Sequence, residues 1–191
     1  DAQESRGLGD VYKRQGTDTL TDVTSGDYNI AIGKQAGANI TTGASNIFIG
    51  QQAGVSGSLQ TESYNIGIGS YVMDDGSCNI QQATAVGSFA LSGPATRDGT
   101  IAIGFKALQD LSTGFQNTAI GYQSMLEHTT GSYNTAIGYG VMQDTDAGTT
   151  SLASQRNVFI GASCGSGTWT DTDNSYNVAI GAAALGLTTT G

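Results

Sequence analysis

The stretch "FQNTAIGYQSM", residues 115–125, decides the fold, because it returns as "SYNTAIGYGVM", residues 132–142. Both copies place asparagine, threonine, alanine, isoleucine and glycine in the same order, 17 residues apart. Alternation of β-branched residues over such a short run is typical of a strand. A short unit repeated at a fixed period predicts a solenoid, in which each unit buries its apolar face against its neighbours.

We call the glycine that ends this motif the marker glycine. Nine copies of the motif are present, at intervals of 17 to 23 residues, and 17 is the commonest interval. The marker glycines are Gly33, Gly50, Gly69, Gly87, Gly104, Gly121, Gly138, Gly161 and Gly181. A glycine in every unit indicates a tight bend or a positive φ angle at this point.

Two columns of the repeat are β-branched throughout and predict a strand with one buried face. The residue before the marker glycine is Ile32, Ile49, Ile68, Val86, Ile103, Ile120, Ile137, Ile160 or Ile180. Two residues earlier stand Ile30, Ile47, Ile66, Thr84, Ile101, Thr118, Thr135, Val158 and Val178. We expect these side chains to form the core, each isoleucine packing on its counterpart in the next coil.

An asparagine stands four residues before the marker glycine in seven of the nine copies, with Ala83 and Thr100 in the other two. The seven are Asn29, Asn46, Asn65, Asn117, Asn134, Asn157 and Asn177. An amide at the same corner of every coil can bond to the next coil, so the column predicts an asparagine ladder.

A second short segment follows each marker glycine, with a small residue three positions on and then leucine or methionine in six copies. We expect it to form a second strand, so that one coil holds two strands and two turns. The sequence thus predicts an all-β, parallel β-solenoid of nine coils, about 43 Å long at the usual strand spacing.

The position between the two β-branched columns is alanine, glycine or phenylalanine in every copy: Ala31, Phe48, Gly67, Ala85, Ala102, Ala119, Ala136, Phe159 and Ala179. Residues at this position point to the opposite face of the strand from the isoleucines. With the isoleucines inside, the alanine column faces solvent, and its lack of charge indicates lateral association between copies. The alternative is that alanine and glycine are simply neutral on a surface.

The composition suits a thin structure and excludes several partners. The chain has 191 residues, of which 29 are glycine and only 12% are charged, and its net charge is −9. An acidic chain without clustered lysine and arginine is not expected to bind nucleic acid or anionic membrane surfaces. No apolar run is long enough to insert into a membrane.

Residues 1–15 differ from the rest of the chain. They contain Arg6, Lys13 and Arg14, three of the seven basic residues, and none of the repeat motif. We expect residues 1–15 to be a non-native or disordered arm and residues 16–191 to be the solenoid. The C-terminal "LTTTG", residues 187–191, stops in the middle of a repeat, so the solenoid is predicted to be truncated there.

Residues that carry chemistry are few, and we expect no catalytic site, no cofactor and no metal. Cys78 and Cys164 lack metal-ligand spacing and are predicted to be buried thiols, the alternative being a bond between them. His128, the only histidine, lies in a turn-rich linker and is expected to be solvated. The acid pairs are Asp74 with Asp75, Asp144 with Asp146, and Asp171 with Asp173. Each is either a solvated loop pair or a calcium ligand.

One insertion is a candidate ligand loop. Residues 165–175 contain Trp169, the only tryptophan, followed by Asp171 and Asp173. An exposed indole beside acids can stack on a sugar ring or meet a basic partner. The alternative is that Trp169 packs over the edge of the coil.

The asparagine, β-branched, alanine, isoleucine and glycine columns over residues 28–185 resemble the YadA-like head repeat of trimeric autotransporter adhesins. They also look like repeats in phage tail fibres. The resemblance implies a left-handed β-roll, three chains around one axis, and an extracellular place on a bacterial surface or a virion tail fibre. The 17-residue unit is longer than the family's usual repeat.

The function implied by this resemblance is attachment to a cell surface, matrix or host receptor by a homo-oligomeric, non-catalytic fibre segment. A phage tail-fibre shaft that binds a receptor is the first alternative. An ice-binding solenoid is the second, although its regular threonine columns are broken here. A fibre enzyme would need a carboxylate pair in a groove, and no pair recurs on the strands.

Overall fold

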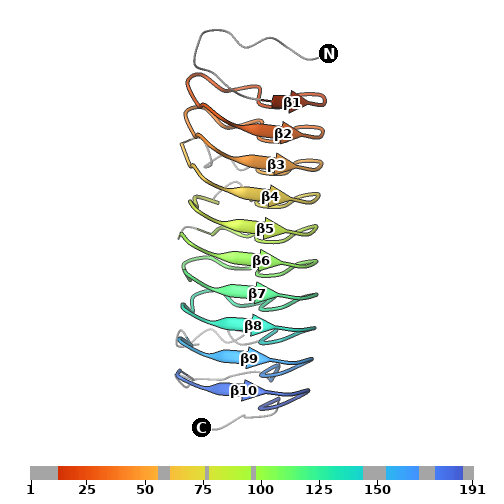
Figure 1. Ribbon diagram of the computed structural model, residues 1–191, viewed down its shortest axis with the longest axis vertical. Helices are drawn as coiled ribbons and strands as arrows, with labels where there is room; N and C mark the ends of the chain where they lie inside the picture. Colours follow the sequence, from red (N-terminus) through yellow and green to blue (C-terminus); the bar gives the residue numbers. More distant parts are fainter. Residues whose placement is uncertain are drawn as a thin grey trace.

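The computed structural model describes residues 13–55, 61–75, 78–95, 98–143, 154–167 and 175–186. These residues form a parallel β-solenoid in which ten strands stack in sequence order into one sheet (Figure 1). The strands are β1 Lys13–Gln15, β2 Ile30–Ile32, β3 Ile47–Ile49, β4 Ile66–Ile68, β5 Thr84–Val86, β6 Ile101–Ile103, β7 Thr118–Ile120, β8 Thr135–Ile137, β9 Val158–Ile160 and β10 Val178–Ile180. The all-β solenoid predicted from the repeat is therefore confirmed.

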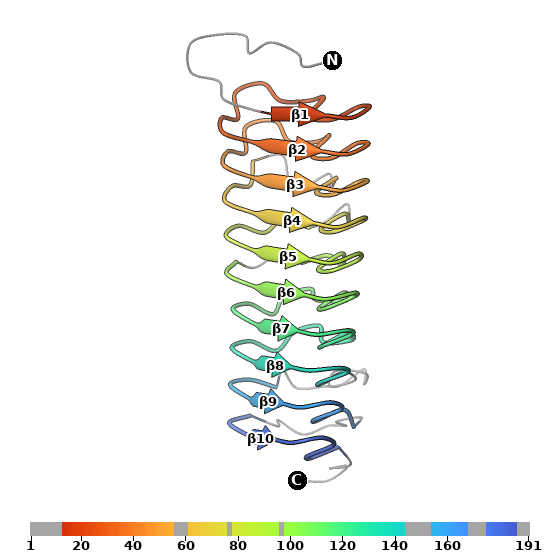
Figure 2. The ribbon, with the colours of Figure 1, turned by 45° about the vertical axis from the view of Figure 1, so that its right-hand side comes forward.

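Each strand pairs in parallel with the strand of the next coil, in one unchanged register. Ala102 of β6 lies opposite Ala119 of β7, which lies opposite Ala136 of β8. Every column of the repeat therefore becomes a straight row along the rod (Figure 2). Ten strands at the usual parallel spacing span about 43 Å.

The solenoid begins earlier than the sequence analysis placed it. Strand β1 lies within the residues assigned to the arm, and Arg14 pairs with Ala31 of β2. Gly16 has a φ of 132° and stands 17 residues before Gly33, so it is a tenth marker glycine. The motif was missed because lysine, arginine and glutamine replace its apolar residues in this coil.

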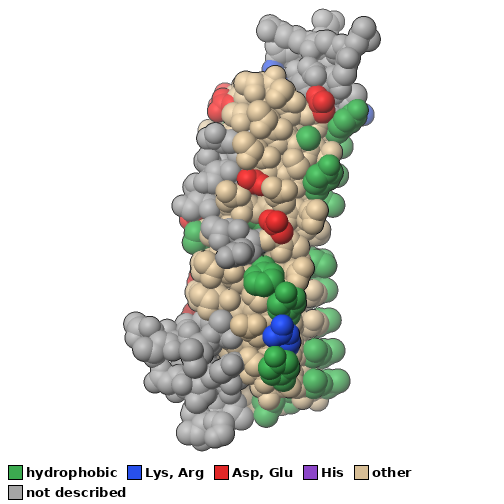
Figure 3. Space-filling view, turned by 90° about the vertical axis from the view of Figure 1, so that its left-hand side faces the viewer, with side chains coloured by type: hydrophobic (Ala, Val, Ile, Leu, Met, Phe, Trp, Pro, Cys, Tyr) green, Lys and Arg blue, Asp and Glu red, His purple; other side chains and the backbone are tan. Residues whose placement is uncertain are grey.

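The faces of the strands are the reverse of those expected from the sequence. The alanine column points inward: Ala85, Ala102 and Ala119 have no exposed surface. The two β-branched columns point outward, and every one of their members in β2–β10 is half-buried or exposed. Figure 3 shows the resulting row of hydrophobic side chains along the right-hand edge of the rod. The proposed association stripe of alanines therefore does not exist on the surface.

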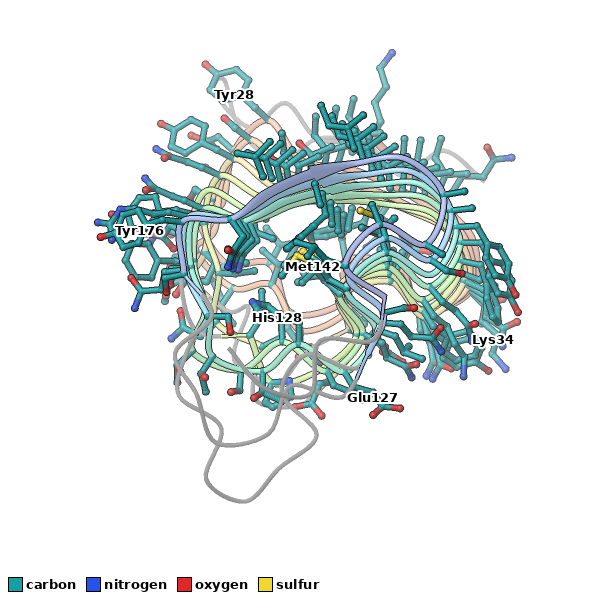
Figure 4. All side chains as sticks on the ribbon, turned by 90° about the horizontal axis from the view of Figure 1, so that it is seen from below. Tyr28, Lys34, Glu127, His128, Met142 and Tyr176 are labelled. Atoms are coloured by element: carbon teal, nitrogen blue, oxygen red, sulfur yellow. The ribbon has the colours of Figure 1, made fainter. Side chains whose placement is uncertain are left out.

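The reason for this reversal is the thinness of the coil. Opposite the strand, the chain returns through the segment that follows the marker glycine, and its leucines and methionines occupy the interior. Met125 and Met142 have no exposed surface, and Met142 points into the centre of the coil in Figure 4. Only a small side chain fits on the strand beside such a residue.

Core volumes are balanced from coil to coil. In the coil of β3, Phe48 occupies the alanine position of the strand. Gly54 occupies the position that is leucine or methionine in most other coils. A Cβ atom added to Gly54 would lie 2.5 Å from the Phe48 ring, and one on Gly67 of the next strand would lie 2.8 Å from it. The two glycines therefore provide the space that the phenylalanine fills, as interior packing density requires.

The second segment of each coil is not a strand, contrary to the sequence expectation. Its backbone alternates into the left-handed region, with φ angles of 51° at Gln123 and 54° at Met125. Successive N–H groups consequently point to opposite neighbours: Gln123 donates to the Phe105 carbonyl and Met125 to the Val141 carbonyl. The segment is bonded to both adjacent coils without extended strand geometry.

The asparagine column forms a buried ladder that joins the coils at one corner. The Asn117 Oδ1 atom accepts the backbone N–H of Asn134 at 2.9 Å, and its Nδ2 donates to the Gly131 carbonyl at 2.7 Å. Asn134 repeats both contacts with Asn157 and Ser154. Each amide therefore satisfies backbone groups that have no strand partner at the corner.

The marker glycines allow the backbones of adjacent coils to touch at the bend. Gly104 has a φ of 136°, and a Cβ atom built on it would collide with the Gly121 carbonyl oxygen. An L side chain is both sterically blocked and conformationally unfavourable there. This contact explains why the position is glycine in every copy.

The gap in the ladder gives a stability prediction. Thr100 occupies an asparagine position, and its buried Oγ1 atom has no hydrogen-bond partner. Thr100→Asn provides a donor for the Gly114 carbonyl and an acceptor for the Asn117 N–H, so we expect the free energy of unfolding to rise by about 1 kcal/mol. Denaturant titration measures this change. Thr113→Asn, at an exposed position, is the control, and a Thr100→Asn protein less stable than that control would contradict the ladder's role.

Candidate functional site

A continuous feature of the described surface is the outward face of the sheet, which we call the sheet face. It consists of the two β-branched columns of β2–β10. Nine strands with two outward residues each give 18 positions, of which 15 are isoleucine or valine and three are threonine. None is charged, whereas the solvated face of a sheet normally alternates polar residues with the buried ones.

Stacking shields the isoleucines from each other but leaves their outer surfaces free. Ile32, Ile68 and Ile101 are 39%, 38% and 38% exposed. With the columns two residues apart, the face of nine strands measures about 40 Å by about 7 Å, or roughly 300 Å² in projection. That is already the size of the largest apolar patch on an ordinary monomer, and such patches usually mark an interaction site.

A row of aromatic rings follows the corner that comes after the marker glycine, which we call the glycine-side corner. Phe105 and Tyr122 stack with centroids 5.3 Å apart, and Tyr122 and Tyr139 stack at 5.2 Å. The row continues towards the N-terminus through Phe89 to Tyr71. The rings contact each other, and Tyr139 remains 58% exposed.

The opposite corner, which comes before the asparagine ladder, carries a second set of aromatic residues. Tyr28, Tyr64, Tyr133 and Tyr176 all stand five residues before a marker glycine and are exposed. Arg156 occupies the same column, between Tyr133 and Tyr176. Figure 4 shows Tyr28 and Tyr176 projecting from this side of the coil, which we call the asparagine-side corner.

His128 is buried in the interior and not solvated, contrary to the sequence expectation. It has no exposed surface, and it points inward in Figure 4 while Glu127 points out. Its Nε2 atom lies 3.3 Å from Asn134 Nδ2. Because Asn134 Oδ1 already accepts the backbone N–H of Asn157, the amide orientation is fixed and His128 Nε2 acts as the acceptor. The histidine is thus part of the core and of the ladder.

The acidic pairs do not form a metal site in the described part of the chain, where no group of three or more histidine, cysteine or acidic side chains converges. Burial raises the pKa of Asp74, and the neighbouring charge of Asp75 raises it further. Asp144 and Asp146 lie outside the described residues, as do Trp169, Asp171 and Asp173 of the candidate ligand loop.

A hollow of about 530 Å³ lies at the N-terminal end of the described solenoid. It is lined by residues of the first coil, among them Arg14, Thr17 and Thr19. The hollow is the N-terminal end surface of the first coil. In every other coil the equivalent surface is covered by the preceding coil, so the hollow does not define a ligand site.

Both cysteines are free and fully buried, as predicted. Burial raises the pKa of Cys78 to about 12, and the charges of Asp75, Asp74 and Glu62 act in the same direction. Burial also raises the pKa of Cys164. Since the thiolate is the reactive form, both groups are chemically inert in the folded chain.

This inertness can be measured directly. At pH 8 we expect a disulfide-exchange reagent to modify neither thiol of the folded protein, and to modify both after denaturation in guanidinium chloride. The result follows from the raised pKa values and from the absence of exposed sulfur. Rapid modification of either thiol in the folded protein would contradict the burial of these two coils.

Sequence reasoning missed the sheet face and the two aromatic corners. Two signals in the sequence could have revealed them. One is the even spacing between the asparagine and alanine columns, and the other is the tyrosine five residues before four of the marker glycines. The asparagine ladder and the alanine column stand two residues apart and so share a face of the chain. A buried ladder therefore places the alanines inside and the isoleucines outside.

Comparison with known proteins gives no match among family models, among curated proteins or among solved structures. Within the described residues, no helix has the length and apolarity needed to cross a membrane. The candidate functional surfaces are consequently defined by the geometry of this chain alone.

Proposed function

We propose that this chain is a structural and adhesive segment of a fibre, which assembles with copies of itself and attaches to a cell surface, matrix or host receptor. The observation that carries the proposal is the uncharged sheet face, which runs along the rod from β2 to β10. A surface of this kind is stable in water when a partner covers it.

A second copy of the chain is the partner that fits the sheet face. The face is straight and repeats at the coil spacing, so another rod with the same repeat matches it along its length. The resemblance to YadA-like heads favours three copies around one axis and a place outside the cell. We infer a trimer from that resemblance and from the sheet face. The sheet face replaces the alanine column as the proposed association surface.

The size of the sheet face indicates that more than the sheet takes part. A stable interface buries about 800 Å² on each partner, which exceeds the roughly 300 Å² of the face. The glycine-side corner adjoins the face and carries apolar rings, among them Phe105 and Tyr122. We propose that copies contact each other over the sheet face and this corner, leaving the asparagine-side corner free.

A charge introduced into the interface gives the test. We expect wild-type protein to have a solution mass near three chains by light scattering, and Ile120→Lys to shift the mass towards one chain. A buried lysine ammonium without a partner costs several kcal/mol, repeated at each interface. Gln116→Lys is the matched control, because it adds the same charge at an exposed position of the other corner.

The control is expected to keep the wild-type mass. A wild-type monomer at micromolar concentration would contradict the proposed assembly, as would an Ile120→Lys protein that retains the wild-type mass. Attachment itself is tested separately, by binding of the labelled wild-type chain to bacterial or host cells. The phage tail-fibre alternative has the same assembly and differs in the surface that is bound.

Ice binding is a second candidate, since the outward direction of the β-branched columns places Thr84, Thr118 and Thr135 on a flat, regular surface. These are three of 18 positions, and no strand carries two outward threonines. The adhesive proposal is therefore preferred. Thermal hysteresis of the freezing point in dilute solution distinguishes the two: a measurable gap would favour ice binding.

A further inference from the structure

An arginine is held between two tyrosines on the asparagine-side corner. The Arg156 guanidinium carbon lies 5.0 Å from the centroid of the Tyr133 ring and 5.5 Å from that of Tyr176. Phe115 packs edge-on against Tyr133 at 5.0 Å and extends the cluster to a fourth coil.

The guanidinium is oriented but not neutralised. Its Nη1 atom donates to Tyr176 Oη at 3.2 Å and to Gln155 Oε1 at 3.5 Å. In the described part of the chain, Arg156 forms no ion pair with a carboxylate, although the protein has 16 acidic and seven basic residues. No described residue occupies its other N–H donors, which lie in the fork geometry that matches a carboxylate.

The cluster is not explained by packing within the rod. Tyr133 is 41% exposed and Tyr176 is 72% exposed, so neither ring contributes to the core. All three residues have left-handed backbones, with φ angles of 61°, 56° and 64° at Tyr133, Arg156 and Tyr176. Glycine or asparagine would be less strained there. Exposed cation–π contacts return only about 0.5–1 kcal/mol each.

We propose that Arg156, Tyr133 and Tyr176 form a binding site for a sugar that bears a carboxylate, such as a sialic or uronic acid residue of a surface glycan. Arg156 binds the carboxylate through two parallel hydrogen bonds. The exposed rings of Tyr133 and Tyr176 pack against the apolar C–H face of the sugar. The Gln155 amide and the tyrosine hydroxyls provide hydrogen-bond partners for the sugar hydroxyls.

The surroundings favour a glycan over an acidic peptide. Peptides commonly bind a sheet by adding a strand to an open edge. Each of β7, β8 and β9 already has a paired strand on both sides, so this part of the rod offers no open edge. The site is shallow, aromatic and rich in hydroxyl and amide groups. This inference rests on the proposed attachment function and specifies its ligand class.

The test compares acidic and neutral glycans on the full chain. The probes are sialyllactose and a glucuronic-acid-terminated oligosaccharide, each paired with its neutral parent, and binding is followed by isothermal titration calorimetry. We expect at least one acidic glycan to bind about tenfold or more tightly than its parent, since a hydrogen bond to a charged group contributes at least that factor.

Arg156→Gln should abolish this preference, so that the acidic glycan and its neutral parent bind with about equal affinity. Lys106→Gln is the matched control, because it removes another cation that lies over an aromatic ring, 5.7 Å from the Phe105 centroid, on the opposite corner. It should leave the preference intact. Arg156→Lys should fall between the two, since it keeps the charge and loses the bidentate geometry. Solution mass and unfolding midpoint establish that each variant is folded, and Tyr176→Ala is a second variant should Arg156→Gln unfold.

Three results would overturn the inference: no preference for either acidic glycan in the wild-type chain, an unchanged preference in Arg156→Gln, or an equal loss in Lys106→Gln. Binding of poly-aspartate with no glycan binding would also overturn it and would assign the cluster to acidic proteins. Any of these leaves the attachment proposal standing if the chain still assembles and binds cells. A wild-type chain that binds neither cells nor glycans would contradict both the attachment proposal and the glycan site.

Discussion

The stacking of one coil directly on the next is the constraint on which the rest of this structure depends. Strands in adjacent coils are separated by only about 4.8 Å, so every residue of a coil lies against its counterpart in the next. At the marker glycines the separation leaves no room for a Cβ atom, because one on Gly104 would collide with the carbonyl oxygen of Gly121. At the opposite corner the same separation allows one asparagine side chain to bond the backbone of the following coil. A residue that suits one coil therefore suits all of them, and the sequence repeats.

Thinness follows from the same geometry and determines which residues can be inside. The alanine position of the strand and the facing position of the returning segment together admit at most one large side chain per coil. In most coils it is leucine or methionine from the returning segment, opposite an alanine of the strand. In the coil of β3 it is Phe48, and the returning segment has Gly54. The isoleucines and valines are consequently left outside, where they give an acidic protein an uncharged face that a partner can cover.

The period of the repeat was sufficient to predict the strands, their parallel order and their register, because these depend only on the sequence being the same in each coil. The assignment of inside and outside could not be made from hydrophobicity, since both faces of the strand are non-polar and the more hydrophobic face lies outside. The asparagine column does distinguish the two faces, because residues an even number of positions from a buried asparagine share its face of the strand. His128 was misplaced for a related reason: a histidine among threonines indicates a loop, and only the stacking of coils shows that it replaces a core residue. The Arg156 cluster brings together residues that are 20 or more positions apart in the sequence. That they are neighbours can be predicted only once the register between the coils is known.

The central claim is that the β-branched columns face outward and are covered by association, whereas the alanine column faces the core. It can be tested most directly by thiol reactivity in two neighbouring single variants, Thr118→Cys and Ala119→Cys, over a dilution series. The native cysteines are buried and serve as unreactive internal references. The account predicts that the thiol at position 118 is protected in concentrated solution and reacts like a free thiol on dilution, while the thiol at position 119 reacts only after unfolding. A reactive thiol at position 119 beside a protected thiol at position 118 at every concentration would contradict the account.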